Sequence, residues 1–280
     1  MQIFREIPPL KAFLVEKRLL GQTIGFVPTM GALHEGHLAL INTSKAENSI
    51  TVCSIFVNPA QFNNAADLQK YPRTLDQDIR LLQSIECDVL FCPEPAEMYG
   101  TTSLIQFDFG QLDKVMEGEF RPGHFSGVAL VVSKLFHIVE PTVAYFGQKD
   151  WQQFAIINRL VKELNFNVAL KSVPTVREQD GLAMSSRNMR LQADQRKEAV
   201  ILFDSLNEAR SLLKKGKSIS DVKSVVQQRV NKNDIRLEYF EVADSENLTV
   251  IKNVDESANP ILCIAACVGD VRLIDNMFYH

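Results

Sequence analysis

Long apolar runs are missing from this sequence, and their absence narrows the classes of protein that it can encode. No stretch reaches the roughly 18 consecutive apolar residues that a transmembrane helix needs. The first nine residues, MQIFREIPP, lack the apolar core of a signal peptide. We therefore expect a cytoplasmic protein that does not bind membranes.

The sequence lacks the cysteine spacing of a metal site and the excess of basic residues that is typical of nucleic-acid binding. The five cysteines form no CxxC pair and show no zinc-like spacing with histidine, so we expect buried thiols and no protein-held metal. With 30 basic and 34 acidic residues the net charge is −4, which argues against a nucleic-acid partner. The one basic cluster, residues 214–217, is interpreted as a solvated helix end. A few local cations would still suffice for a small anionic ligand.

The chain has 280 residues, of which 46% are apolar, enough for one large or two modest domains. Strand-like and helix-like segments alternate as far as residue 173, which predicts an α/β fold whose parallel sheet carries helices on both faces. The expected strands are 23–27, 49–57, 88–91, 142–146 and 167–173, and the expected helices are 10–20, 35–47, 75–85, 124–139 and 150–164.

The pattern changes near residue 175, where a second domain is predicted. Residues 195–214 and 219–231 are helix-like, and 236–243, 260–268 and 270–276 are strand-like. We therefore divide the chain into a first domain, 1–175, and a smaller α+β domain, 176–280. The loop 181–188 lies at the junction, so we expect the smaller domain to act as a lid over a site there.

The segment PTMGALHEGH (28–37) is the sharpest local signal, because it lies between a predicted strand and a predicted helix. Gly31 and Gly36 would let the backbone approach a ligand, and free N–H groups at a helix start favour phosphate. His34 and His37 would share one helix face and could donate hydrogen bonds to phosphate. The alternative is that the two rings only cap or line a helix end.

Two further segments carry side chains suited to a nucleotide. In FGQKD (146–150), Lys149 could contact a phosphate and Asp150 could contact a ribose hydroxyl, although a capped helix with a surface lysine fits as well. In DGLAMSSRN (180–188), two hydroxyls and an arginine suit a triphosphate. Gln61 and Gln153 could bind a small polar substrate through their amides. The turn 121–124 is interpreted as structural or lid-like, and Trp151 as a packing residue.

Six strings, in this order, resemble the pantothenate synthetase (pantoate–β-alanine ligase) family: PTMGALHEGH (28–37), SIFVNPAQF (54–62), YPRT (71–74), RPGHFSGV (121–128), FGQKDWQQ (146–153) and PTVREQDGLAMSSRN (174–188). HxGH with a late loop of serines and a basic residue also resembles the wider nucleotidyltransferase superfamily. That superfamily has a Rossmann-like sheet, which the resemblance implies for the first domain.

The resemblance implies a two-step reaction without a covalent enzyme intermediate. ATP and pantoate would give pantoyl adenylate and pyrophosphate, and the amine of β-alanine would then release AMP and pantothenate. Mg²⁺ would arrive with ATP, and the protein would be a homodimer formed through its N-terminal domain.

The resemblance also implies roles for individual residues. His37, His34, Lys149 and Arg187 would be catalytic, with His37 the candidate proton donor. Gln61 and Gln153 would bind pantoate, and Gln61 would also meet β-alanine. The ATP site would comprise Met30, Gly31, Ala32, Leu33, His34, Glu35, Gly36, His37, Gly147, Gln148, Lys149, Asp150, Val176, Met184, Ser185, Ser186 and Arg187.

Three positions depart from the family's pattern. Gln148 replaces the usual glutamate, which leaves position 148 only a backbone role, and Leu130 stands in the expected buried helix where threonine is common. Gln77 interrupts the acidic residues after YPRT, so no protein ligand for magnesium is assigned.

Three other functions remain open at this point. The chain could be a nucleotidyltransferase acting on a phosphate ester, although such a substrate would favour another basic residue in place of Gln61 and Gln153. A tRNA synthetase is disfavoured by the acidic charge. A non-catalytic nucleotide-binding module would have no need of the His pair, Lys149 and Arg187.

Overall fold

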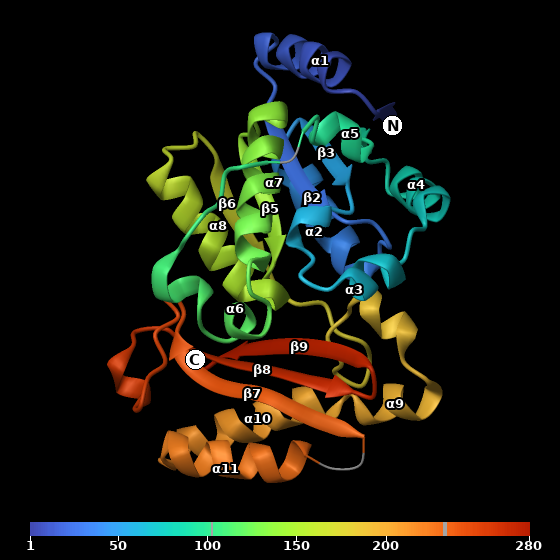
Figure 1. Cartoon of the computed structure of the whole chain (residues 1–280). Helices are drawn as coiled ribbons and strands as arrows, with labels where there is room; N and C mark the ends of the chain where they lie inside the picture. Colours follow the sequence, from blue (N-terminus) through green and yellow to red (C-terminus); the bar gives the residue numbers. More distant parts are fainter. Residues whose placement is uncertain (102, 232–233) are drawn as a thin grey trace.

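The large sheet of the computed structural model contains six parallel strands, and the model describes residues 1–101, 103–231 and 234–280. The order across the sheet is β1-β4-β3-β2-β5-β6 (Figure 1). The strands are β1 (Gln2–Phe4), β2 (Ile24–Thr29), β3 (Ile50–Ile55), β4 (Val89–Phe91), β5 (Val143–Gly147) and β6 (Ala169–Val173).

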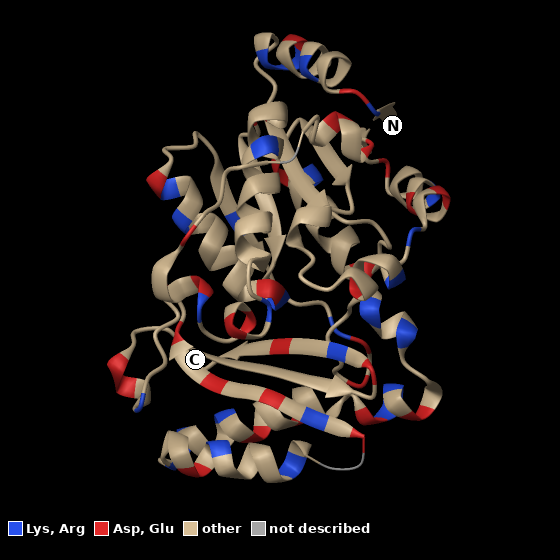
Figure 2. Ribbon diagram, viewed as in Figure 1, with Lys and Arg blue, Asp and Glu red and all other residues tan. Residues whose placement is uncertain are grey.

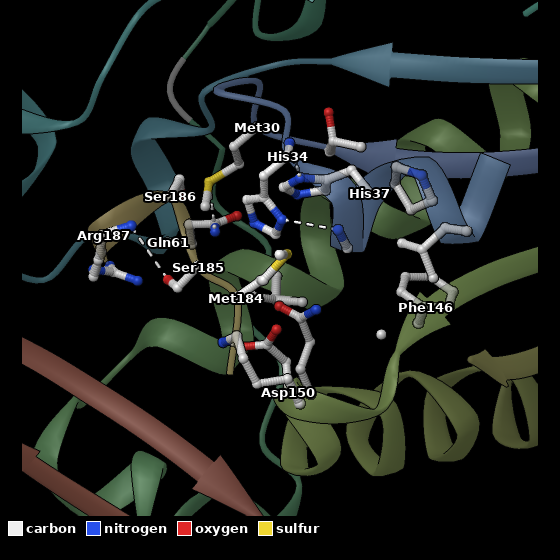
Figure 3. Close-up of a pocket in the computed structure, with 18 of the residues that line it drawn as sticks. Met30, His34, His37, Gln61, Phe146, Asp150, Met184, Ser185, Ser186 and Arg187 are labelled. Carbon is white, nitrogen blue, oxygen red and sulfur yellow. Dashed lines mark hydrogen bonds and ion pairs between the residues drawn. The ribbon is translucent and has the colours of Figure 1, made fainter. Parts of the chain in front are cut away.

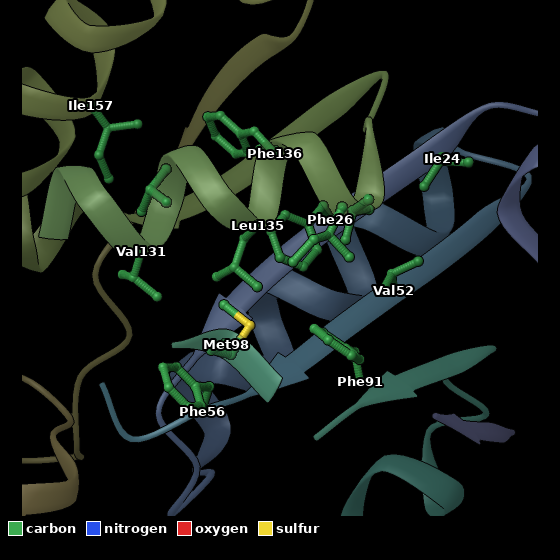
Figure 4. Close-up of a cluster of buried hydrophobic side chains, with 14 of the residues drawn as sticks. Ile24, Phe26, Val52, Phe56, Phe91, Met98, Val131, Leu135, Phe136 and Ile157 are labelled. Carbon is green, nitrogen blue, oxygen red and sulfur yellow. The ribbon is translucent and has the colours of Figure 1, made fainter. Parts of the chain in front are cut away.

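Helices cover both faces of this sheet, because successive side chains of each buried strand point to opposite sides. On β2, Phe26 packs with α7 and α1, whereas Val27 packs with α2 and α4. Figure 4 shows the first of these cores, which contains Phe26, Leu135 and Phe136. The helices of this domain are α1 (Ile7–Leu19), α2 (Glu35–Glu47), α3 (Ala65–Lys70), α4 (Leu75–Ser84), α5 (Pro95–Met98), α6 (Glu117–Phe120), α7 (His124–Val139) and α8 (Trp151–Glu163).

The strand order changes direction between β2 and β5, which are neighbours although more than 110 residues separate them. After β2 the chain builds β3 and β4 on one side, and it then crosses back to build β5 and β6 on the other. Ligands of such sheets bind beyond the carboxyl ends of the strands at this switch point. The segments that leave it here begin at Met30 and Gln148.

The C-terminal residues form a small sheet with its own core. Three antiparallel strands lie in the order β7-β8-β9, and α10 and α11 pack on one face. The other face meets the large domain, where Trp151 stacks edge-on against Phe278 and donates a 2.8 Å hydrogen bond to the Ser245 carbonyl. The elements are α9 (Ala193–Glu198), α10 (Ile201–Lys214), α11 (Ile219–Val230), β7 (Ile235–Asp244), β8 (Pro260–Val268) and β9 (Val271–Phe278).

These observations confirm the predicted α/β fold with a smaller α+β portion, and they correct several details. The first helix starts at Ile7 rather than after the two prolines, because proline fits the first turn of a helix. The helix predicted at 195–214 is divided into α9 and α10. Leu130 is half-buried and lines a surface groove with Tyr99, so it does not lie in the core.

Four of the five cysteines are buried and the fifth, Cys267, is half-buried; none forms a disulfide. Over residues 1–101, 103–231 and 234–280, no helix is both long enough and apolar enough to cross a bilayer. Lys and Arg segments alternate with Asp and Glu segments over both domains in Figure 2.

Candidate active site

A cavity of about 200 Å³ lies at the switch point and is lined by residues from both predicted domains. Met30, His34 and His37 come from the segment after β2, and Lys149 and Asp150 follow β5. Figure 3 shows the two histidines beside each other, with Met184, Ser185 and Arg187 on the loop next to them.

The two histidines use one nitrogen each to start α2. His34 occupies the N-cap, and its Nδ1 accepts a 3.1 Å hydrogen bond from the Gly36 amide. His37 reaches back, so that its Nδ1 accepts from the His34 amide at 3.3 Å. An acceptor nitrogen carries no proton, so in each neutral ring the proton lies on Nε2. Both rings therefore keep one N–H donor free of the helix cap.

Both rings are neutral at physiological pH. Burial, together with the charge of Lys149, lowers the pKa of His34 to about 4. Burial, followed by the charges of His34 and Lys149, lowers the pKa of His37 to about 3. Protonation would also place a hydrogen on Nδ1, where each ring now accepts one. The pair is thus a set of two neutral hydrogen-bond donors 4.1 Å apart between ring centroids.

Glycine and aspartate residues fix the loop that carries the histidines. A Cβ on Gly36 would stand 2.8 Å from His34 Cε1, so any other residue here would require the His34 ring to shift from its place over the helix start. Buried Asp78 of α4 accepts hydrogen bonds from the amides of Ala32 and Leu33 at 3.0 and 2.8 Å. The space above Gly36 therefore accommodates the His34 ring as well as the cavity. The amides of Ala32 and Leu33 are occupied by Asp78, so they are not free to bind a phosphate.

Lys149 and Asp150 lie at the start of α8 and point into the cavity. Lys149 is only 17% exposed and pairs with Asp150 at 3.2 Å, so it is not a surface lysine. Asp150 holds the N-cap position without a side-chain cap hydrogen bond. Burial raises the pKa of Asp150, but the Lys149 charge and hydrogen bond outweigh it and lower the pKa overall. The carboxylate is thus ionised and available to a ligand.

The loop after β6 closes the cavity from the side of the smaller sheet. The Met184 amide donates a hydrogen bond of 3.0 Å to the Val176 carbonyl. This bond holds the segment 184–186 in the wall of the cavity. A 3₁₀ helix, η4 (Ser186–Arg190), follows. Asp67 of α3 pairs with both Arg187 and Arg190, at 3.0 and 3.1 Å, and so fastens this loop to the first domain.

Gln61 and Gln153 also line the cavity, and Asn58 orients Gln61. Asn58 is buried, and its Nδ2 donates to Gln61 Oε1 at 3.1 Å and to the Gly127 carbonyl at 3.0 Å. Its Oδ1 accepts from the Tyr99 hydroxyl at 2.8 Å. The Gln61 amide nitrogen is directed at Met30 Sδ, 3.1 Å away. The Gln61 amide is therefore held in one orientation in the cavity wall.

A family model described as pantoate–β-alanine ligase matches residues 2–278. The chain belongs to the pantoate–β-alanine ligase family. A pantothenate synthetase of Cytophaga hutchinsonii is 47% identical over 273 residues, which cover 97% of this chain and 96% of that protein. A pantothenate synthetase of Azobacteroides pseudotrichonymphae is 47% identical over the whole of both chains.

Solved structures agree with the sequence relatives. Pantothenate synthetase from Thermus thermophilus superposes with a TM-score of 0.93 at 39% identity, and each chain covers 100% of the other. The ligase from Francisella tularensis, complexed with β-γ ATP and β-alanine, has a TM-score of 0.84 at 35% identity and covers 100% of this chain and 98% of that one. Membership in this ligase family, predicted from the six strings, is confirmed.

The structure gathers most of the predicted site residues but not all of them. Gly31, Ala32, Leu33, Glu35 and Gln148 do not line the cavity. The Gln148 carbonyl accepts from Asn276 Nδ2 at 2.9 Å, so position 148 acts here through its backbone. Those that do line it are Met30, His34, Gly36, His37, Gln61, Gly147, Lys149, Asp150, Gln153, Val176, Met184, Ser185, Ser186 and Arg187.

Several residues around the cavity were not singled out from the sequence. Asn58 lies inside the string SIFVNPAQF, and its position between a strand and Gln61 was a usable signal. Asp67 and Asp78 gave none, because their partners lie 120 and about 45 residues away in the chain. Among the described residues, no group of three or more His, Cys, Asp or Glu side chains could hold a metal ion.

Proposed function

We propose that this chain joins pantoate to β-alanine at the expense of ATP, which makes it a pantoate–β-alanine ligase of pantothenate and coenzyme A biosynthesis. The observation that carries the proposal is one cavity lined by the His pair, Lys149, Arg187 and two glutamines, in a member of this ligase family. The Francisella relative, crystallised with β-γ ATP and β-alanine, supports ATP and β-alanine as substrates.

In the first step, the pantoate carboxylate attacks the α-phosphorus of ATP. An oxygen–phosphorus bond forms, the bond from that phosphorus to the bridging oxygen breaks, and pyrophosphate leaves. Negative charge grows on the phosphate oxygens, so catalysis is alignment plus charge stabilisation. The Nε2–H donors of His34 and His37 and the Lys149 ammonium suit this task.

In the second step, the free amine of β-alanine attacks the acyl carbon of pantoyl adenylate. A carbon–nitrogen bond forms, the carbon–oxygen bond to AMP breaks, and the proton lost from the attacking amine passes to water. With a pKa of about 3, His37 has no additional proton to donate at neutral pH. We therefore assign it hydrogen-bond donation instead of the proton transfer that the family resemblance implies.

The other residues that line the cavity would each contact one part of a substrate. Lys149 and the loop from Met184 to Arg187 would contact the phosphates, Asp150 the ribose, and the Val176 backbone the adenine. Gln61 and Gln153 would bind pantoate, with Gln61 also near β-alanine. The amides of Ala32 and Leu33 would not contact ATP, because they already donate to Asp78.

Four further features belong to the proposal. Mg²⁺ would be carried by the phosphate oxygens of ATP. The protein would act in the cytoplasm as a homodimer formed through residues 1–175. Residues 176–280 would act as the lid.

The test is exchange of labelled pyrophosphate into ATP, with Mg²⁺ present and β-alanine absent. Exchange that requires pantoate is the expected result, and later addition of β-alanine should give AMP rather than ADP. Exchange that requires a phosphate ester instead would identify a nucleotidyltransferase. ATP binding without exchange on any acid would leave only a nucleotide-binding module.

A further inference from the structure

The second substrate carries a charge that the proposed reaction does not consume. β-Alanine reacts through its amine, while its carboxylate stays ionised and must enter a site that already holds an adenylate phosphate. A buried anion of this kind needs a cation with hydrogen-bond donors. Lys149 and Arg187 are assigned to the phosphates, so a further cation is needed close to Gln61.

Arg121, in the turn before α7, is such a cation. Its side chain is only 17% exposed, and it lines two cavities that adjoin the ATP cavity. One of them, about 80 Å³ in volume, is shared with Met30, Gln61 and Gln153. Arg121 therefore faces the space where the acyl group of pantoate is expected.

The guanidinium of Arg121 is incompletely paired. Its Nη1 donates to His124 Nε2 at 3.1 Å and lies 3.8 Å from Glu117 Oε2, and these are its side-chain partners among the described residues. Glu117 is already held by Arg272 through two hydrogen bonds of 2.7 Å and by the Tyr239 hydroxyl at 2.8 Å. Glu117 thus stays satisfied whether or not Arg121 is present.

The charge of Arg121 persists in this environment. Burial, together with the neighbouring Arg187, lowers the pKa of Arg121 to about 10, which leaves it protonated at neutral pH. An incoming carboxylate would supply the counter-ion and accept from the nitrogens that His124 does not use.

His124 ties Arg121 to the expected pantoate site. The ring is buried, and its Nδ1 lies 2.8 Å from the Gln61 carbonyl, which can only accept. Nδ1 therefore carries the proton, and Nε2 accepts from Arg121. The relay from Arg121 through His124 to Gln61 fixes the guanidinium relative to the residue proposed to hold pantoate.

We infer that Arg121 binds the carboxylate of β-alanine and thereby selects amines that carry a terminal anionic group. Two methylene groups separate the amine of β-alanine from this carboxylate, so the amine can reach the acyl carbon while the carboxylate stays on Arg121. The inference depends on the proposed function, and it adds a specificity residue that acts only in the second step.

The experiment measures the two steps separately in wild type, Arg121→Gln and Arg121→Lys. Arg159→Gln, at an exposed arginine of α8 that pairs with Glu163, is the matched control. Pantoate-dependent pyrophosphate exchange reports the first step. Pantothenate formation at varied β-alanine reports the second, with β-alaninamide as the amine that lacks a carboxylate.

For Arg121→Gln we expect exchange within about twofold of wild type and a β-alanine KM raised about 10- to 100-fold, as for a lost hydrogen bond to a charged group. The preference for β-alanine over β-alaninamide should fall by the same factor. Arg121→Lys, which keeps the charge, should lose less, and Arg159→Gln should change neither step.

Two results would overturn the inference. Exchange that falls as far as the second step would show that Arg121 serves the phosphates. An unchanged preference for β-alanine over β-alaninamide in both Arg121 variants would remove the carboxylate contact. Absence of pantoate-dependent exchange in wild type is a different result, because it contradicts the proposed function itself.

Discussion

His34 and His37 each perform two tasks with two different nitrogens. Nδ1 accepts a backbone hydrogen bond that starts α2, and this fixes the proton on Nε2. Burial then keeps both rings neutral. The structural interpretation of the HxxH spacing and the chemical one are therefore compatible, because the helix cap itself orients the donors.

Replacement of His37 tests the role of its Nε2–H. We expect His37→Ala to lower the rate of pantoate-dependent exchange by about 10²- to 10³-fold, the usual effect of removing one preorganised donor. ATP affinity should change far less, because the contact strengthens as charge develops. Exchange kinetics and ATP titration of the same preparation measure the two effects. Collapse of ATP affinity with an intact saturated rate would contradict a transition-state role.

Single residues were predictable where a local spacing carried them. The His pair and Lys149 stand in short strings between a strand and a helix, so the sequence alone located them. Asp78 and Asn58 orient the site through partners that the chain brings together only on folding. A carboxylate in an amphipathic helix gives no sign that it will accept two loop amides.

At the scale of elements, the start of α2 depends on the absence of a side chain at Gly36. A Cβ there would stand 2.8 Å from His34 Cε1, so Gly36→Ala should displace the ring and break the cap. We expect a loss of about 1 kcal/mol in the free energy of unfolding, together with a marked fall in exchange activity. Gly100→Ala is the control, since a Cβ at Gly100 meets nothing within 4 Å. Denaturant unfolding of both variants and of wild type measures the loss. A Gly36→Ala protein as stable as wild type would show that the His34 ring adapts to the added methyl group.

The pairing of α3 with η4 gives a second prediction at this scale. Asp67 of α3 holds Arg187 and Arg190 of η4. Burial raises the pKa of Asp67, but the two arginines outweigh it and keep the carboxylate ionised. In Asp67→Asn we expect amide hydrogen exchange over 184–190 to accelerate about three- to tenfold without ATP, since partly exposed ion pairs contribute modestly.

ATP should restore much of this protection, because the phosphates would replace Asp67 as the partner of Arg187. Asp76→Asn, in α4 and outside this ion pair, is the control. Equal exchange in Asp67→Asn and wild type would mean that other contacts hold the loop.

The length of an element decided whether the sequence could predict it. The long amphipathic or buried segments α2, α7 and β8 were predicted to the residue. β1 has three residues and is held by parallel pairing with β4, and α6 has four residues, which is only about one helical turn. Pairing and packing across the fold stabilise such short elements, so no local pattern indicates them.

At the scale of the whole molecule, the part built on the large sheet and the part built on the small sheet meet through a buried charged contact as well as an apolar one. Glu117 of α6 and Arg272 of β9 form a bidentate pair, and Trp151 packs against Phe278 beside it. The change of pattern near residue 175 indicated two units. The contact between them could not be predicted, because it joins residues that are 155 positions apart.

Three neutral histidines, of which His124 is buried and His34 and His37 are half-buried, make the folded molecule sensitive to acid. The pKa values of His34, His37 and His124 are lowered from 6.5 to about 4, 3 and 3, chiefly by burial. Below pH 6.5 the unfolded chain binds protons that the folded chain refuses, so stability falls as pH decreases from 6.5 toward these lower values. Each ring should cost about 1.4 kcal/mol of unfolding free energy between pH 7.5 and pH 5.5.

Urea unfolding at these two pH values should therefore show a loss of about 4 kcal/mol from the three rings together. His124→Asn is the informative variant, because the asparagine amide can still donate to the Gln61 carbonyl but does not titrate. It should reduce the pH dependence by about a third while wild type and variant remain comparable at pH 7.5. We infer a neutral His124 in the folded state from the hydrogen bond that its Nε2 accepts from Arg121. An identical pH dependence in both proteins would contradict that inference.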